Sequence, residues 1–295
     1  MSRPKVPPVV WRTAVATGRA TARVTASMRP PPDFLIVGTQ RGGTTSLHRY
    51  LLEHPNVLGA RFAKGVHWYD EHYDRPLRWY QRHFPTTLER QLVERRTGHP
   101  AVVGESSPYY LFHPFTAERI AATLPEVKVV AILRDPVTRA WSHYQHNVAR
   151  DMEPLPFADA LEAEAGRLAG AEERLRVPGT IDLDHRRGSY VARGLYLDQL
   201  ERLWSHVDED RTLVLFSHDL DTDPAGTVAR VHTFLGLEPH PVDATRRWNR
   251  QPDAELPAGT RERLVDAFAE PDARLARRLG VELPWPAAPP AAPPA

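Results

Sequence analysis

The stretch FLIVGTQRGGTTSLHRYL, residues 34–51, constrains the fold of this chain more than any other. Its first five residues form an apolar run typical of a strand that is buried on both faces. After a Gly-Gly pair, Leu47, Tyr50 and Leu51 fall on one face of a helix, which we expect Pro55 to end. A strand that turns through glycines into a helix directs backbone N–H groups and the positive end of the helix dipole at one spot. The segment therefore predicts a P-loop-type α/β fold with an anion site, although a Gly-Gly turn with threonine caps can also simply start a helix.

The predicted anion is unlike that of an ATPase. Gly38 and Gly43 have the spacing of the Walker A loop G-x-x-x-x-G-K-[ST], but Thr44 stands where that loop has lysine. Gly42 and Gly43 allow close approach of the backbone, and the cation lies inside the loop, at Arg41. The hydroxyl groups expected to add donors belong to Thr44, Thr45 and Ser46.

Apolar runs and helical patterns alternate through the rest of the chain. Further strands are predicted at residues 101–105, 127–133 and 212–216, with amphipathic helices around residues 196–203 and 228–235. This alternation is typical of a parallel sheet covered by helices on both faces. We expect a single α/β domain over residues 33–286, a basic arm over residues 1–32 and a disordered Pro/Ala-rich tail over residues 287–295.

A second candidate for anion binding follows the strand at 127–133. Arg134 comes directly after the strand, Pro136 can open the next helix, and Ser142 lies two helical turns beyond Arg134. The carboxyl ends of parallel strands are where such sheets bind ligands. A single arginine here could instead cap a carboxylate or a chain terminus.

Composition excludes several classes of protein. With no cysteine, the chain has no disulfide, no thiolate nucleophile and no cysteine-ligated metal. A net charge of +1 argues against a nucleic-acid binder. Without a long apolar window or a signal peptide, we expect a cytoplasmic protein. The arm contains no acidic residue, and we expect it to be mobile or to touch an anionic membrane surface; its basic residues are Arg3, Lys5, Arg12, Arg19, Arg23 and Arg29.

Two motifs together carry a family resemblance. GTQRGGTTSL and LRDPVTRAWSHY resemble the nucleotide motifs of sulfotransferases that use 3'-phosphoadenosine 5'-phosphosulfate (PAPS), closest to the heparan-sulfate-type and bacterial branches. KGVHWYDEHY, VVGESSPYYLFHP, RGLYLDQLERLW and ARLARRLGVELPWP extend the match in family order. The resemblance implies that the first loop holds the 5'-phosphosulfate, that Arg134 and Ser142 hold the 3'-phosphate, and that 3'-phosphoadenosine 5'-phosphate (PAP) is the product. It implies no metal.

The chain departs from the family pattern at several positions. Arg41 replaces the usual lysine, Gly65 stands where heparan-type enzymes carry a catalytic glutamate, and Ser106 replaces a basic acceptor contact. The cysteine-bridged loop is absent, and Arg250 in RRWNRQ is a candidate nucleotide contact. These changes favour a carbohydrate, phenolic or natural-product acceptor over a heparan-like polyanion.

The catalytic base is expected at His67, because related cytosolic sulfotransferases use histidine and imidazole titrates near neutral pH. Alternatively, His67 orients the acceptor while Asp70 or an activated water takes the proton. The surrounding cluster from His67 to Asp74 follows no metal-ligand spacing, so no metal site is predicted. Two other functions stay open: a P-loop kinase or NTPase, and a nucleotide-binding module without turnover. The sequence predicts no oligomeric state.

Overall fold

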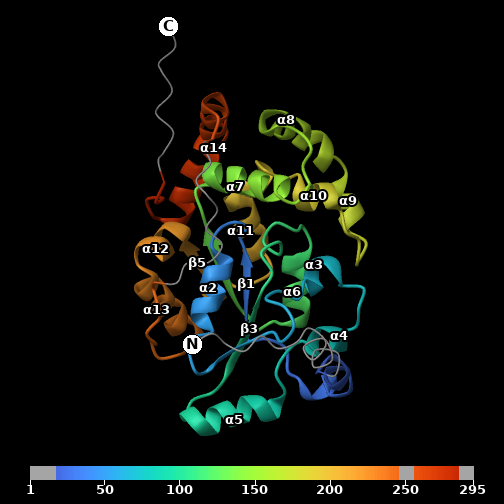
Figure 1. Ribbon diagram of the computed structural model, residues 1–295, viewed down its shortest axis with the longest axis vertical. Coiled ribbons are helices and arrows are strands. Elements are labelled where there is room, and N and C mark those ends of the chain that lie inside the picture. Colours follow the sequence, from blue (N-terminus) through green and yellow to red (C-terminus); the bar gives the residue numbers. More distant parts are fainter. Residues whose placement is uncertain (1–17, 246–255, 286–295) are drawn as a thin grey trace.

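Five parallel strands form the centre of the molecule (Figure 1). The computed structural model describes residues 18–245 and 256–285. The sheet order is β2-β3-β1-β4-β5, with strands β1 Phe34–Gly38, β2 Val57–Gly59, β3 Val102–Ser106, β4 Lys128–Leu133 and β5 Thr212–Phe216. The predicted α/β fold is confirmed, and the four predicted strands agree with the structure to within one residue at each end. The three-residue strand β2 was not predicted, because so short a run has no recognisable period.

Side chains of the central strands alternate between two cores. Leu35 and Val37 pack on one face of the sheet with Val129 and Ala131, whereas Phe34 and Ile36 pack on the other. Because both faces are buried, the strands read as continuous apolar runs rather than as alternating ones.

Helices cover both faces of the sheet, as predicted. Residues of α2 and α13 pack with Phe34 and Ile36. Residues of α3, α4, α6, α11 and α14 pack with Leu35 and Val37. The helices are α2 Thr44–Leu51, α3 Trp68–Glu71, α4 Leu77–Gln81, α5 Thr87–Thr97, α6 Thr116–Thr123, α7 Pro136–Val148, α8 Phe157–Leu168, α9 Ala171–Leu175, α10 Leu183–Arg187, α11 Tyr196–Trp204, α12 Ser217–Thr222, α13 Pro224–Leu235 and α14 Ala258–Leu279. Three short 3-10 turns are η1 Ala26–Met28, η2 Ala192–Gly194 and η3 Glu209–Arg211.

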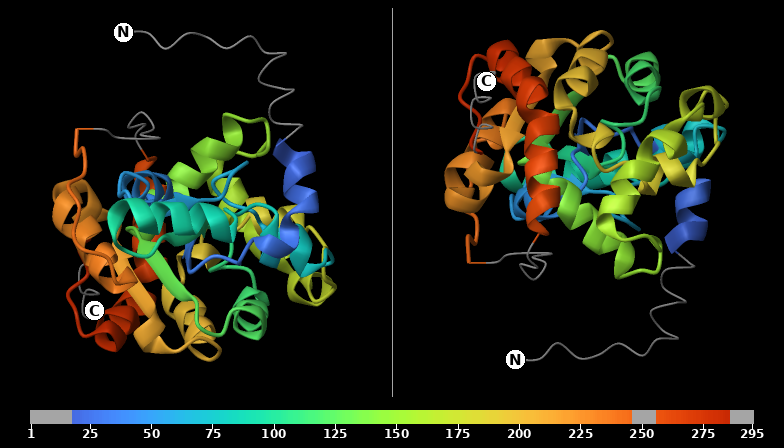
Figure 2. Two further views of the ribbon diagram at one scale, coloured as in Figure 1. Left: turned by 90° about the horizontal axis from the view of Figure 1, so that it is seen from below. Right: turned by 90° about the horizontal axis from the view of Figure 1, so that it is seen from above.

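Helix α7 lies beyond the carboxyl end of the sheet, on a third core shared with α8 and α14 (Figures 1 and 2). Pro136 is its first residue, and the Asp135 carboxylate accepts hydrogen bonds from the amides of Val137 and Thr138. Helix α2 ends at Leu51, four residues before the predicted stop at Pro55.

The described part of the predicted arm packs on the domain. Residues 18–24 are helical, and the buried Arg29 donates a 2.5 Å hydrogen bond to the carbonyl of Phe84. Residues 1–17, the candidate Arg250 and the tail from residue 286 lie outside the described residues. Among the helices of the described ranges, none is both long and apolar enough to cross a lipid bilayer.

Candidate active site

The loop Thr39–Gly43 leads from β1 into α2 and presses against β4. A Cβ atom at Gly42 would lie 2.7 Å from the carbonyl oxygen of Ile132, so this position has room for glycine alone. Gly43 caps α2 with a φ of 96°, and the amide of Leu47 makes the first intrahelical bond, to the Gly43 carbonyl. The amides of the first turn precede that bond, so they have no partner within the helix. The start of α2 therefore has the geometry of an anion site, and the role of Thr44, Thr45 and Ser46 in binding one stays a prediction.

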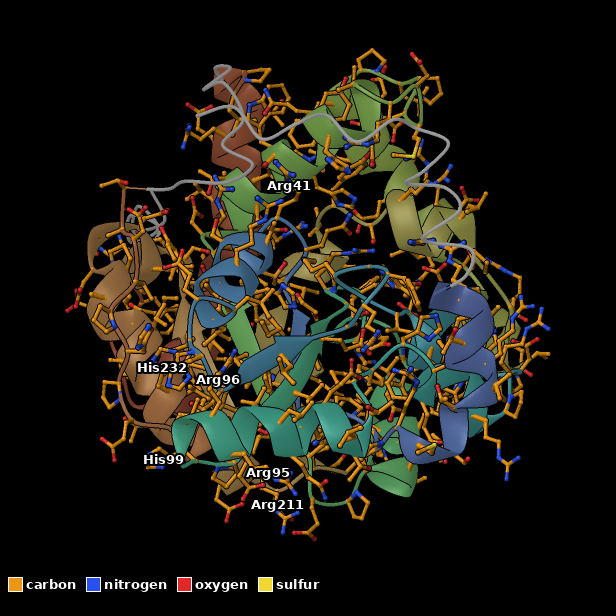
Figure 3. The ribbon with its side chains drawn as sticks, turned by 60° about the horizontal axis from the view of Figure 1, so that its bottom comes forward. Arg41, Arg95, Arg96, His99, Arg211 and His232 are labelled. Carbon is orange, nitrogen blue, oxygen red and sulfur yellow. The ribbon has the colours of Figure 1, made fainter. Side chains whose placement is uncertain are left out.

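Arg41 brings the two predicted motifs together. Its Nε donates a 3.0 Å hydrogen bond to Ser142 Oγ on α7, and Arg134 Nη1 donates a 3.1 Å bond to the Arg41 carbonyl. Figure 3 shows Arg41 near the α7 end of the molecule, away from Arg95 and Arg96 on α5. Arg41, Arg134 and Ser142 thus form one cluster in the folded chain, although a hundred residues separate Arg41 from Ser142.

The charge of this cluster is not neutralised by the described residues. Burial, with Arg134 and Arg150 close by, lowers the pKa of Arg41 to about 10. Burial and the charges of Arg41 and Arg150 lower the pKa of His146 to about 4, so this imidazole is neutral at pH 7. Within residues 18–245 and 256–285, Arg41 and Arg134 have no ion pair with a carboxylate. Two guanidinium groups without a counter-charge at the start of a helix are suited to a bound polyanion.

A third cation, Lys64, was missed by the sequence analysis. Its Nζ lies 3.2 Å from both Thr44 Oγ1 and Thr45 Oγ1, at the first turn of α2. Burial lowers its pKa to about 8, an effect that the Glu105 carboxylate opposes and Arg49 reinforces. The signal was present, because Lys64 opens the KGVHWYDEHY segment that carries part of the family resemblance.

The backbone that carries Lys64 is held by one buried carboxylate, Glu105. Its Oε2 accepts hydrogen bonds from the Val66 amide at 2.5 Å and from Ser107 Oγ at 2.8 Å. Its Oε1 accepts from the hydroxyls of Tyr80 and Tyr110. All four partners are donors, which favours the ionised carboxylate, but burial outweighs them and raises the pKa of Glu105.

The same network continues along the segment. Ser107 Oγ accepts from the His67 amide at 3.1 Å, and Tyr110 Oη accepts from the Trp68 amide at 2.9 Å. Three consecutive amides are thus fixed, the first by Glu105 itself and the next two by hydroxyl groups that donate to it. This explains how His67 is kept in the left-handed region, with a φ of 53°.

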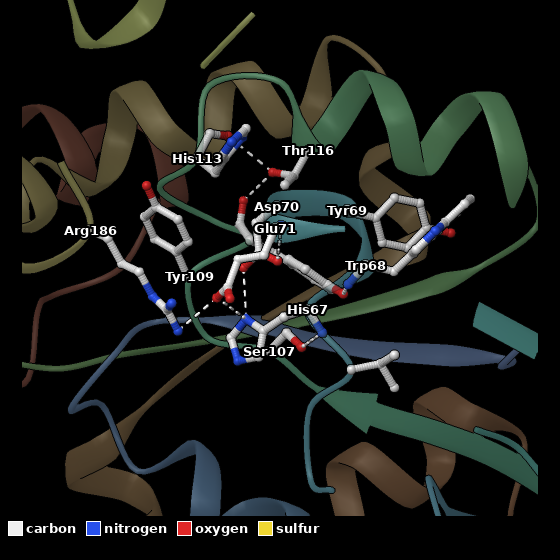
Figure 4. A network of polar contacts seen from close by, with 12 residues as sticks. His67, Trp68, Tyr69, Asp70, Glu71, Ser107, Tyr109, His113, Thr116 and Arg186 are labelled. Atoms are coloured by element: carbon white, nitrogen blue, oxygen red, sulfur yellow. Dashed lines mark hydrogen bonds and ion pairs between the residues drawn. The ribbon is translucent and has the colours of Figure 1, made fainter. Parts of the chain in front are cut away.

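His67 and Asp70 form a close pair (Figure 4). His67 Nδ1 lies 2.8 Å from Asp70 Oδ2 and 3.4 Å from Glu71 Oε1, while Arg186 Nη2 lies 2.6 Å from that same Glu71 oxygen. Burial alone would lower the pKa of His67, but the carboxylates of Asp70 and Glu71 raise it. The pairing indicates that the proton is on Nδ1 of His67 and is donated to the Asp70 carboxylate. Among the described residues, Nε2 has no hydrogen-bond partner.

The three ligand-type groups of this cluster are close enough to hold an ion. Atoms of His67, Asp70 and Glu71 lie within 4.8 Å of one another. However, the Nδ1–H of His67 faces Asp70, and Arg186 pairs with Glu71, so both carboxylates already have partners. These contacts explain the arrangement of the three side chains. That the site binds no metal stays a prediction.

Comparisons with known proteins agree with this geometry. A family model described as "Sulfotransferase domain" matches residues 31–252. Human heparan sulfate glucosamine 3-O-sulfotransferase 3B1 is 31% identical over 209 residues, covering 70% of this chain and 46% of that protein. The human bifunctional heparan sulfate N-deacetylase/N-sulfotransferase 3 is 31% identical over 216 residues, covering 71% of this chain and 23% of that protein. The chain therefore spans less than half the length of these two relatives.

A solved structure covers more of the molecule. The crystal structure of a sulfotransferase from Alicyclobacillus acidocaldarius is 28% identical, with a TM-score of 0.64, and the match covers 86% of this chain and 98% of that one. The family model, the curated relatives and this structure lead to one assignment: the chain belongs to the PAPS-dependent sulfotransferase family.

Proposed function

We propose that this protein transfers a sulfonate group from PAPS to a hydroxyl or amine of a carbohydrate, phenolic or natural-product acceptor. The observation that carries the proposal is the contact of Lys64 with Thr44 and Thr45 at the start of α2, directly after the loop that holds Arg41. The His67–Asp70 pair follows Lys64 in the same segment. In the reaction, the bond between sulfur and the bridging phosphate oxygen breaks, and a bond from sulfur to the acceptor atom forms. The acceptor proton passes to a base.

The donor is held by two groups of residues. The loop at Arg41, Gly42 and Gly43, with Thr44, Thr45 and Ser46, surrounds the 5'-phosphosulfate. Arg41 replaces the usual lysine of this loop, and Lys64 adds a second positive charge beside Thr44 and Thr45. Arg134 and Ser142 bind the 3'-phosphate, and Ser142 also connects it to Arg41 through a 3.0 Å hydrogen bond. Both motifs therefore bind the same PAPS molecule.

Arg41 and Lys64 act on the charge that develops during transfer. As the S–O bond breaks, negative charge builds on the bridging oxygen of the leaving phosphate. A guanidinium and an ammonium in a partly buried site stabilise that charge more strongly than they would in water. We assign Arg41 the larger effect on the chemical step.

His67 is the proposed base, and Asp70 is its positioning partner. Nδ1–H is directed at the fully buried Asp70 carboxylate, so Nε2 carries the lone pair. This lone pair takes the proton from the hydroxyl or amine that receives the sulfonate. The resulting imidazolium is stabilised by Asp70 and Glu71. The glutamate base of heparan-type relatives is not required in this scheme.

The experiment measures donor binding and turnover separately. PAP should raise the melting temperature of the purified protein without magnesium, whereas Mg-ATP should not. Incubation with PAPS and a library of glycans, phenols and lipids, followed by mass spectrometry, should show a sulfonate gain. Stabilisation by Mg-ATP alone would instead assign the protein to the kinases or NTPases. PAP binding with no product from any acceptor would support a binding module.

A further inference from the structure

A cluster of arginines without matching carboxylates lies around α4, on the side of the domain where the chain enters. Burial lowers the pKa of Arg82, and the nearby charges of Arg23, Arg19 and Arg75 lower it further. Figures 1 and 2 both show the helix over residues 18–24 beside α4. Asp74, at 3.5 Å from Arg75, is the one carboxylate paired with any of these four among the described residues. Within the described residues, the cluster therefore has an excess of positive charge.

Exposed aliphatic side chains adjoin the same arginines. Val24 follows Arg23 and is 86% exposed, and Met28 is 57% exposed. Thr87 Oγ1 donates to the Met28 carbonyl, which brings the 57% exposed Leu88 to this place, and Leu77 begins α4. We call this surface the arginine-aliphatic face; it comprises Arg19, Arg23, Val24, Met28, Arg75, Leu77, Arg82 and Leu88.

We propose that the arginine-aliphatic face docks on an anionic lipid bilayer. Anionic headgroups attract the arginines, and the aliphatic side chains enter the boundary between headgroups and acyl chains. A soluble polyanion would use the cations alone and would leave Val24, Met28 and Leu88 in water.

The preceding chain supports this choice of occupant. Residues 1–17 contain Arg3, Lys5 and Arg12, no acidic residue, and the apolar run Val9-Val10-Trp11. Because residues 1–17 are also positively charged, they cannot neutralise the arginines of the face. An anion from outside the protein is therefore the better partner for these arginines. The sequence of residues 1–17 has the same mixture of basic and apolar residues as the face.

Co-sedimentation of the full chain with vesicles tests the proposal. The protein should bind phosphatidylcholine vesicles that contain phosphatidylserine, but not pure phosphatidylcholine vesicles, and added salt should weaken binding. Val24→Ser with Met28→Ser should reduce the partition coefficient about tenfold, and Arg19→Gln with Arg23→Gln should do the same. Because these side chains are exposed, the variants should melt like the wild type.

Matched controls lie on α14 and just after it. Arg261→Gln with Arg277→Gln removes the same charge, and Val281→Ser removes an exposed aliphatic side chain; both should leave vesicle binding unchanged. Equal binding of the aliphatic variant and the wild type, or loss of binding in the controls, would overturn the proposal. So would retention on heparin that depends on Arg19 and Arg23 while anionic vesicles fail to bind. None of these measurements depends on turnover.

Discussion

A Cβ atom on Gly65 would lie 2.4 Å from the carbonyl oxygen of Ser106 and 2.6 Å from Ser107 Oγ. The segment that contains Lys64 and Gly65 packs against the end of β3, because the Ser106 amide donates a 3.0 Å hydrogen bond to the Lys64 carbonyl. The position that carries a catalytic glutamate in heparan-type enzymes therefore has no room for any side chain. The close packing of this segment therefore explains why a glycine, and not a glutamate, occupies this position.

Substitution of Gly65 should consequently destabilise the protein rather than restore a base. Gly65→Ala should lower the free energy of unfolding by about 1–3 kcal/mol, the usual cost of overpacking, and Gly65→Glu should cost more without adding activity. Urea denaturation measures both. Gly166→Ala in α8, where a new Cβ meets nothing within 4 Å, is the control and should be neutral or stabilising. A more active Gly65→Glu variant would contradict this interpretation.

Lys64 should make donor binding depend on pH. With a pKa of about 8 in the free protein, it is mostly protonated at pH 7 and mostly neutral at pH 9.5. An anion favours the protonated form, so the affinity for PAP should fall as the pH rises through 8, and binding near pH 8 should take up a proton. Calorimetry in buffers of different ionisation enthalpy measures this uptake.

Lys64→Met should bind PAP weakly at pH 7 and should lose the uptake of a proton near pH 8. Arg41, whose pKa is about 10, stays charged over most of this range and cannot replace that signal. If the variant keeps the pH dependence of the wild type, Lys64 is not the titrating group.

Arg134 should discriminate ligands by their 3'-phosphate. Arg134→Ala should weaken PAP binding by about 1.5–3 kcal/mol, the scale of a charge-assisted hydrogen bond. The loss should be much smaller for adenosine 5'-phosphate, which lacks the 3'-phosphate. Some loss of affinity is still expected for adenosine 5'-phosphate, because Arg134 also donates a hydrogen bond to the Arg41 carbonyl. Equal losses for both ligands by calorimetry would show that Arg134 only braces the loop.

The parts of this site that sequence could predict are those fixed by local pattern. Local sequence was enough to recognise the strand-loop-helix at residues 34–51 and the segment from Arg134 to Ser142, because glycines, helix starts and apolar runs are short-range signals. Local pattern could not predict that Lys64 contacts Thr44, since this contact depends on how a loop twenty residues away returns to α2. The role of Glu105 was equally hidden: its four donors come from three separate segments. Steric exclusion at Gly65 also requires the packed structure.

The last prediction concerns the base. His67→Asn should lower kcat by about 10²- to 10⁴-fold, the usual cost of losing a general base, while PAP affinity stays within a factor of two of wild type. Asparagine is the suitable replacement because it tolerates the left-handed backbone of this position. The wild-type rate should fall as the pH drops through the pKa of His67, which Asp70 and Glu71 hold above its ordinary value, since protonation at Nε2 removes the lone pair. Asp70→Asn should move this limb to lower pH and reduce kcat less than His67→Asn does. If instead His67→Asn retains activity and Asp70→Asn is inactive, Asp70 accepts the proton and His67 only orients the acceptor.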